Sequence, residues 1–306
     1  MGNHMKLSGV LFFPATPFDS RGEVDVAVLR AHVAAGLEHG PGGVFAACGT
    51  GELNALAEGE QALVVRETVA AADGAVPVVA GAGGALGTAL AHTRAAAEAG
   101  ADAVLLLPPY LALGSAEGLH AYVSAVAEVG LPVVLYQRGP LVLEPADAVG
   151  LTRIPGVVGF KDGLGDIDRM QRTVLAVRAA HGPDEITFFN GLPTAELTQP
   201  AYRAIGVHLY SSAAFCFVPE VATAYRDALE TGSELAGTLL SEFYGPLVEL
   251  RSSVPGYAVA LVKAGLRLRG VEAGKVRAPF VEPTAAHLSE LARIIDRGLA
   301  AVRAGS

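Results

Sequence analysis

The stretch VVGFKDGLGD, residues 157–166, is an apolar run that ends on a lysine and continues at once into a glycine-rich, acidic turn. Seven further apolar runs occur along the chain, at 9–14, 43–48, 76–81, 103–108, 132–136, 186–190 and 207–212. These runs are continuous rather than alternating, which is typical of parallel strands covered on both faces. Stretches with helical spacing separate them, and several of these end at glycine, a favoured helix stop.

Eight regular strand–helix units predict an α/β fold of the (β/α)8, or TIM-barrel, class. An open doubly wound sheet is the alternative, but eight such units favour closure. From about residue 233 the alternation stops, and helical stretches follow at 233–250, 255–270 and 284–303. We therefore expect a barrel over 5–232 and a helical extension, packed on the barrel, over 233–306. Residues 1–4 are interpreted as an expression-tag remnant ahead of a native start at Met5.

Charge and composition argue against several classes of function. The net charge of −9 disfavours nucleic acid and anionic membranes as partners, because both attract basic surfaces. No apolar run approaches the roughly 20 residues that span a bilayer. Two cysteines, Cys48 and Cys216, are too few for a disulfide framework, and the start lacks a secretion signal, so a cytoplasmic location is expected. The eight histidines show no metal-binding spacing, so no metal site is expected.

The ends of the predicted strands supply the candidate site, because (β/α)8 barrels carry their active sites at the C-terminal ends of the strands. Lys161 is one of only four lysines in the chain. A partly desolvated amine has a lowered pKa and can attack a ketone, and Tyr136, one strand away, could move protons. The alternatives are a lysine that reaches solvent from a strand end, or one that pairs with Asp162.

Two further strand ends carry weaker signals. The turn at 48–52, CGTGE, offers adjacent backbone N–H groups and the Thr50 hydroxyl, a pattern that suits a carboxylate or phosphate. The same glycines would also serve a tight turn for backbone reasons alone. Arg138 either faces a substrate carboxylate or contacts a neighbouring loop.

Several motifs together resemble the dihydrodipicolinate synthase/N-acetylneuraminate lyase family. They are FPATPFD at 13–19, GTGE at 49–52, Tyr136 in VVLYQR, Lys161 in VVGFKDGLGD, and the more specific GLPTAE at 191–196 and YSSA at 210–213. The resemblance runs from about Leu7 to Pro283. It implies that Lys161 forms an imine and that Tyr136 moves protons. It also implies that Thr50 and the Gly49 backbone hold the carboxylate beside the ketone, with Gly191 and Ser211 near the imine.

The resemblance further implies a branch of the family that dehydrates and decarboxylates a six-carbon keto sugar diacid. Such an enzyme needs no metal or organic cofactor and works as a homo-oligomer, a tetramer or a dimer. Two departures weigh against the synthases: Gly49 replaces a threonine, and YQRGPL (136–141) replaces a motif whose arginine holds the second substrate. The alternatives are an aldolase that releases pyruvate from a 2-keto-3-deoxy sugar acid, and a non-catalytic barrel that binds keto acids.

Overall fold

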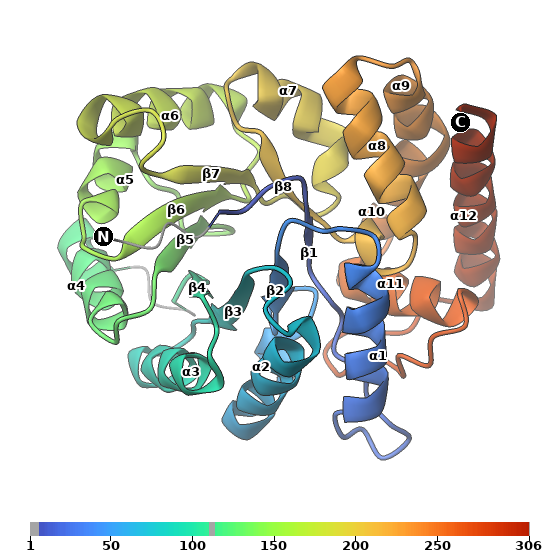
Figure 1. Cartoon of the computed structure of the whole chain (residues 1–306), viewed down its shortest axis with the longest axis horizontal. Helices are drawn as coiled ribbons and strands as arrows, with labels where there is room; N and C mark the ends of the chain where they lie inside the picture. Colours follow the sequence, from blue (N-terminus) through green and yellow to red (C-terminus); the bar gives the residue numbers. More distant parts are fainter. Residues whose placement is uncertain (1–5, 110–113, 306) are drawn as a thin grey trace.

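In the computed structural model, which describes residues 6–109 and 114–305, eight parallel strands close into a barrel in sequence order (Figure 1). The strands are β1 Val10–Phe12, β2 Val44–Ala46, β3 Val78–Ala82, β4 Ala103–Leu106, β5 Val133–Gln137, β6 Val157–Asp162, β7 Thr187–Asn190 and β8 Leu209–Ser212. Closure comes from β1 and β8, which pair in parallel with Leu11 opposite Ser211. All eight predicted strands are present. The apolar runs extend beyond the hydrogen-bonded ladders because buried residues such as Phe13 and Cys48 continue into the loops.

Helices surround the strands (Figure 1). They are α1 Val26–Leu37, α2 Glu58–Ala72, α3 Leu86–Ala99, α4 Ala116–Ala127, α5 Pro145–Thr152, α6 Ile167–His181, α7 Gln199–Ala204 and α8 Pro219–Thr231, with short turns η1 Leu53–Ala55, η2 Ala195–Thr198 and η3 Ala214–Cys216. Helices α1 to α7 each return the chain to the start of the next parallel strand, as the barrel topology requires, whereas α8 leads from β8 into the helical extension. None of the described helices combines the length and the hydropathy of a membrane-spanning segment.

The barrel is followed by a helical extension, as predicted. It consists of α9 Leu235–Leu239, the π-helical turn η4 Leu240–Tyr244, α10 Gly245–Ser252, α11 Tyr257–Leu268 and α12 Ala285–Gly305. Helix α12 packs against α8, α9, α10 and α11, and Figure 1 shows it at the edge of the molecule beside α8. The division at residues 232 and 233 remains a proposal, and residues 1–4 lie outside the described part of the chain.

Two hydrophobic clusters divide the core. The larger one joins strand and helix residues, whereas the smaller one contains strand and strand-end residues only and therefore fills the barrel interior. The interior cluster consists of Leu11, Phe13, Phe45, Cys48, Val79, Ala103, Leu105, Val134, Tyr136 and Phe189. The register between β5 and β6 shifts at Val133/Val134, after which Tyr136 lies opposite Lys161. The bulge thus sets the two principal candidate residues side by side at the top of the interior.

Helix α1 packs on β1 through a glycine, and this contact yields a stability prediction. A Cβ at Gly36 would lie 2.4 Å from Phe12 Cε1, and both residues are buried. Gly36→Ala should therefore lower the free energy of unfolding by about 1–3 kcal/mol through overpacking, despite the better helix propensity of alanine. Gly150→Ala, inside α5 with no atom within 4 Å, is the matched control and should leave stability unchanged or slightly higher. Urea unfolding of both variants checks the contrast, and equal effects would contradict it.

Candidate active site

The amine of Lys161 lies in an aromatic sandwich at the end of β6. Its Nζ is 4.1 Å from the ring centroid of Phe13 and 4.5 Å from that of Tyr136. Phe13 in turn stacks on Phe45, with ring centroids 4.4 Å apart. The lysine is only 4% exposed, so it does not reach solvent. The floor made by Phe13 and Phe45 was not predicted, although Phe13 belongs to the FPATPFD motif.

Asp162 does not pair with Lys161, because successive side chains of a strand point to opposite faces. Its carboxylate is buried on the other face of β6, where it accepts hydrogen bonds from Gln137 Nε2 at 2.7 Å and from the Tyr202 hydroxyl. It also accepts from the backbone N–H of Leu164 at 3.2 Å, which fixes the glycine-rich turn. Asp162 therefore holds the loop after Lys161, and the ion-pair alternative for the lysine is wrong.

Tyr136 and Gly191 form the wall beside the amine. The Tyr136 hydroxyl donates a hydrogen bond of 2.7 Å to the carbonyl oxygen of Gly191. A Cβ at Gly191 would lie 2.6 Å from both Cγ and Cε of Lys161, so a side chain there would displace the lysine. A Cβ at Gly163 would likewise approach Tyr136 Cε2 to 2.9 Å. Ser211 lies at the end of β8 and donates to the carbonyl of Asn190 at 3.4 Å.

Burial is the main influence on the charges of this site. It is the largest cause of a lowered pKa of about 7 for Lys161, a value to which Cys48 also contributes in the upward direction and the nearby Arg138 guanidinium in the downward direction. Burial also raises the pKa of the Cys48 thiol to about 12. The pKa of Tyr136 is raised by burial too, although Arg138 opposes this. Near neutral pH the site therefore holds an amine that is substantially unprotonated beside a protonated phenol.

The turn after β2 offers unused hydrogen-bond donors. Within the described chain, no group accepts a hydrogen bond from the backbone N–H of Gly49, Thr50 or Gly51. The Thr50 hydroxyl is likewise without a partner among the described residues, and its side chain is only half-buried. Arg138 faces this turn, since a Cβ at Gly49 would lie 3.4 Å from its Nη1. The arrangement offers four donors and a cation, which is the chemistry that binds a carboxylate.

The two most specific sequence motifs meet beneath the ends of β7 and β8. Glu196 of GLPTAE accepts a hydrogen bond from the hydroxyl of Ser212 in YSSA, and both side chains are buried. The Tyr225 hydroxyl donates to the backbone carbonyl of Glu196 at 2.8 Å. Burial raises the pKa of Glu196 to about 7. The contact between these two stretches was not predicted from the sequence.

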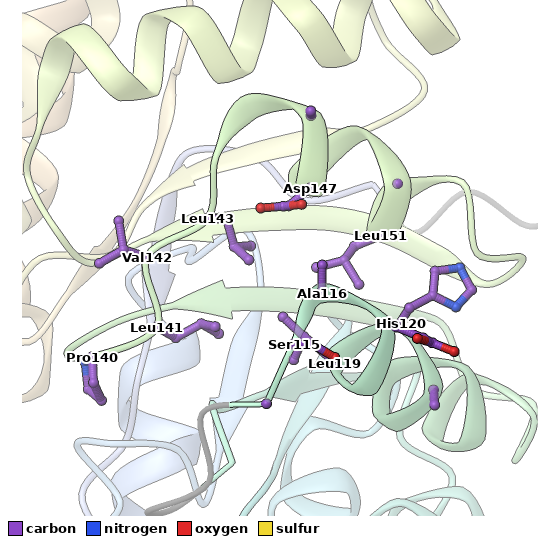
Figure 2. A pocket seen from close by; sticks show the side chains of 15 residues that line it. Ser115, Ala116, Leu119, His120, Pro140, Leu141, Val142, Leu143, Asp147 and Leu151 are labelled. Carbon is purple, nitrogen blue, oxygen red and sulfur yellow. The ribbon is translucent and has the colours of Figure 1, made fainter.

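A cavity of about 610 Å³ lies at the same end of the barrel as Lys161 but outside the ring of strands. It separates α4 from α5 and from the loop after β5 (Figure 2). Its wall is mainly apolar, with Leu119 and Leu143, and His120 and Asp147 are polar residues at its edge. Lys161 is not part of its lining, so the candidate site is the strand-end cluster. Among the described residues, no group of three or more His, Cys, Asp or Glu side chains has a metal-binding arrangement.

The comparison with known proteins supplies the family. A sequence model described as the dihydrodipicolinate synthetase family matches residues 6–297. The chain belongs to this family. A probable 5-dehydro-4-deoxyglucarate dehydratase of Streptomyces griseus is 53% identical over 298 residues, which cover 96% of this chain and 92% of the relative. A second protein of that name, from Streptomyces coelicolor, is 52% identical and covers 98% of this chain and 95% of its own length.

Solved structures agree with the family assignment. The crystal structure of dihydrodipicolinate synthase from Bacillus clausii superposes with a TM-score of 0.86 at 27% sequence identity. The superposition covers 94% of this chain and 96% of that one. The sequence-based resemblance to the family is therefore confirmed over nearly the whole chain.

The lowered pKa of Lys161 can be measured by competitive labelling. Its reactivity toward trace acetic anhydride should rise with pH around a midpoint near 7, because the unprotonated amine predominates above that value. Restricted access would lower the rate but would not move the midpoint. In urea the same peptide should titrate near the usual lysine value of about 10.4, which provides the control. Mass spectrometry of the Lys161 peptide gives both curves, and a midpoint in the folded protein above about 9 would contradict the environment described.

Proposed function

We propose that the protein is a 5-dehydro-4-deoxyglucarate dehydratase that converts its substrate to 2,5-dioxopentanoate, CO2 and water. The observation that carries the proposal is the buried amine of Lys161, held between Phe13 and Tyr136. The names of the relatives that exceed 50% identity over nearly the whole chain select this reaction within the family.

The first step is imine formation. The unprotonated amine of Lys161 attacks C5, the ketone carbon of the substrate, and water leaves as the protonated imine forms. An amine with a pKa near 7 suits this step, because it is nucleophilic at neutral pH without a separate base. The positive imine then withdraws electrons from the neighbouring C4 and makes its hydrogens acidic.

Tyr136 acts as a proton relay in the dehydration. Burial raises its pKa, so the phenol remains protonated and does not start as a phenolate base. Its oxygen accepts a proton from C4 while its own hydrogen turns from the Gly191 carbonyl to the hydroxyl leaving C3. The C3 hydroxyl departs as water, and the product is an unsaturated imine conjugated from C3 to the lysine nitrogen. The tyrosine ends the step with one proton, as it began.

Decarboxylation uses the same electron sink. The C1–C2 bond breaks to release CO2, and its electron pair moves through C2, C3 and C4 to the imine nitrogen. The resulting dienamine bears an enol at C2, which becomes the aldehyde as C3 and C4 gain protons. Hydrolysis then frees 2,5-dioxopentanoate and restores Lys161. No cofactor is required in this scheme, because the imine supplies the electron sink that organic cofactors provide elsewhere.

The turn after β2 binds the C6 carboxylate beside the ketone. Its free backbone N–H groups and the Thr50 hydroxyl provide the hydrogen bonds, and Arg138 adds a positive charge. No carboxylate among the described residues forms an ion pair with Arg138, so its charge is available to the substrate. Gly191 and Ser211 complete the surroundings of the imine.

We further propose that the enzyme works in the cytoplasm as a homo-oligomer, either a tetramer or a dimer. The two thiols support the location, since both are buried and unpaired. A solved dihydrodipicolinate synthase that is 25% identical is described as the first monomeric variant, which indicates that its relatives assemble.

Product analysis tests the proposed function. Incubation with 5-dehydro-4-deoxyglucarate should release CO2 and 2,5-dioxopentanoate in equal amounts. Lys161→Met, which keeps an unbranched side chain but has no amine, should release neither. Pyruvate in place of CO2 would show an aldolase instead. Binding of the substrate with no turnover would indicate a barrel that binds keto acids without catalysis.

Tyr136→Phe separates proton transfer from folding. The turnover rate should fall by about 10²- to 10⁴-fold, the usual contribution of a positioned acid–base group. The melting temperature should fall only slightly, because one hydrogen bond to Gly191 is lost. Tyr122→Phe is the matched control, since it also removes a bond from a phenol to a backbone carbonyl, that of Gly84, at 3.1 Å. The turnover rate of Tyr122→Phe should remain that of the wild type. A Tyr136→Phe enzyme with the wild-type turnover rate would show that another group transfers the proton.

A further inference from the structure

A second buried lysine lies outside the aromatic sandwich and has a different partner. Lys263, on α11 of the helical extension, contacts Glu52 of the β2 turn, with Nζ 2.7 Å from Oε1 and both side chains fully buried. The lysine also donates to the backbone carbonyl of Lys275 at 2.9 Å. Burying a charge pair is unfavourable unless the remaining hydrogen-bonding groups are satisfied. The mechanism proposed above uses neither residue.

The segment after α11 completes the environment of Glu52. The backbone N–H of Arg277 donates to Glu52 Oε2 at 2.9 Å. The Arg277 guanidinium donates to the carbonyl of Ala55 at 2.9 Å and forms a two-point contact with Glu60 on α2. The ring of Phe18 contacts both cations: its centroid is 3.8 Å from Lys263 Nζ and 4.0 Å from the guanidinium carbon of Arg277. The extension thus holds both ends of the segment that runs from the β2 turn into α2.

Glu52 itself belongs to the turn after β2 and has an unusual backbone conformation there. Its φ is +59°, a left-handed conformation that is uncommon for a residue with a side chain. In this conformation its N–H closes the turn on the carbonyl of Gly49 at 3.2 Å. The buried hydroxyl of Thr16 donates a hydrogen bond of 2.7 Å to the carbonyl of Gly51. These two bonds hold the turn while the N–H groups of residues 49–51 have no acceptor among the described residues.

We propose that Lys263 is a positioning residue for the active site: through Glu52 it holds the β2 turn in the conformation that presents its N–H groups to the substrate carboxylate. This inference rests on the carboxylate-binding role proposed for the turn. The helical extension is then part of the binding apparatus, since one of its side chains sets the geometry of a loop of the barrel. Loss of the pair should weaken carboxylate binding and leave the chemistry of Lys161 unchanged.

The double variant Glu52→Gln/Lys263→Met tests the inference, because it removes both buried charges and leaves neither unpaired. Its affinity for pyruvate, measured by calorimetry, should fall about tenfold to a hundredfold, the value of a hydrogen bond to a charged group. KM for the sugar diacid should rise in parallel, while kcat and the pH midpoint of Lys161 labelling should match the wild type. Glu52→Asp keeps the charge but retracts it by one methylene, and it should show a smaller loss of affinity for pyruvate. This variant replaces the double variant in the test if the double variant does not fold.

Arg269→Met is the matched control. Arg269 follows α11 and pairs at 2.6 Å with Glu220 of the barrel helix α8, far in sequence from the β2 turn. The Arg269→Met substitution removes one contact between the extension and the barrel but none with the β2 turn. The affinity for pyruvate should therefore remain that of the wild type. Folded Glu52 or Lys263 variants with wild-type affinity, or with only kcat reduced, would overturn the inference. Wild-type protein that binds no pyruvate would overturn it as well. If the wild type binds pyruvate but does not turn over the diacid, the proposed function fails, and the pyruvate affinities still test the role of Lys263.

Discussion

The constraint on which the rest of this site depends is the burial of one amine that has no carboxylate partner in the described part of the chain. Lys161 is 4% exposed and contacts aromatic faces instead of a counterion. Such an amine is compatible with the fold because its pKa falls toward 7 and the group can be buried uncharged. Two neighbouring features are consistent with a buried, uncharged amine. Glycine at 191 leaves space for the lysine side chain, and Asp162 is directed to the opposite face of β6.

The two buried lysines show how surroundings determine what the same side chain can do. Lys263 has a carboxylate at 2.7 Å and a backbone carbonyl at 2.9 Å, so its ammonium form is stabilised and its nitrogen is occupied. Among the described residues Lys161 has neither kind of partner, and its nitrogen is therefore available to react. Burial lowers the pKa of both, but Glu52 opposes this for Lys263, whose pKa falls only to about 8. The ion pair therefore suits Lys263 to a structural role. Its absence leaves Lys161 suited to nucleophilic chemistry.

Much of the architecture could be predicted from the sequence. Each β-strand overlaps an apolar run, and the convergence of strand ends in a barrel predicts that Lys161, Tyr136 and the β2 turn are neighbours. The contacts that refine the site could not be predicted in this way. The bulge that sets Tyr136 opposite Lys161 leaves no periodic signal, and the pairs Glu52–Lys263 and Glu196–Ser212 join irregular segments through tertiary packing. The need for glycine at position 163 is explained only by the Tyr136 ring, which a Cβ at this position would approach too closely.

The central claim is that Lys161 is the residue that forms a covalent imine with the substrate ketone. Borohydride reduction in the presence of 5-dehydro-4-deoxyglucarate or pyruvate, followed by peptide mass spectrometry, tests it most directly. The account predicts a stable adduct on the peptide that contains Lys161 and no adduct in Lys161→Arg, whose guanidinium stays protonated. An adduct on Lys263 or Lys275, or unimpaired turnover by the Lys161→Arg protein, would contradict it.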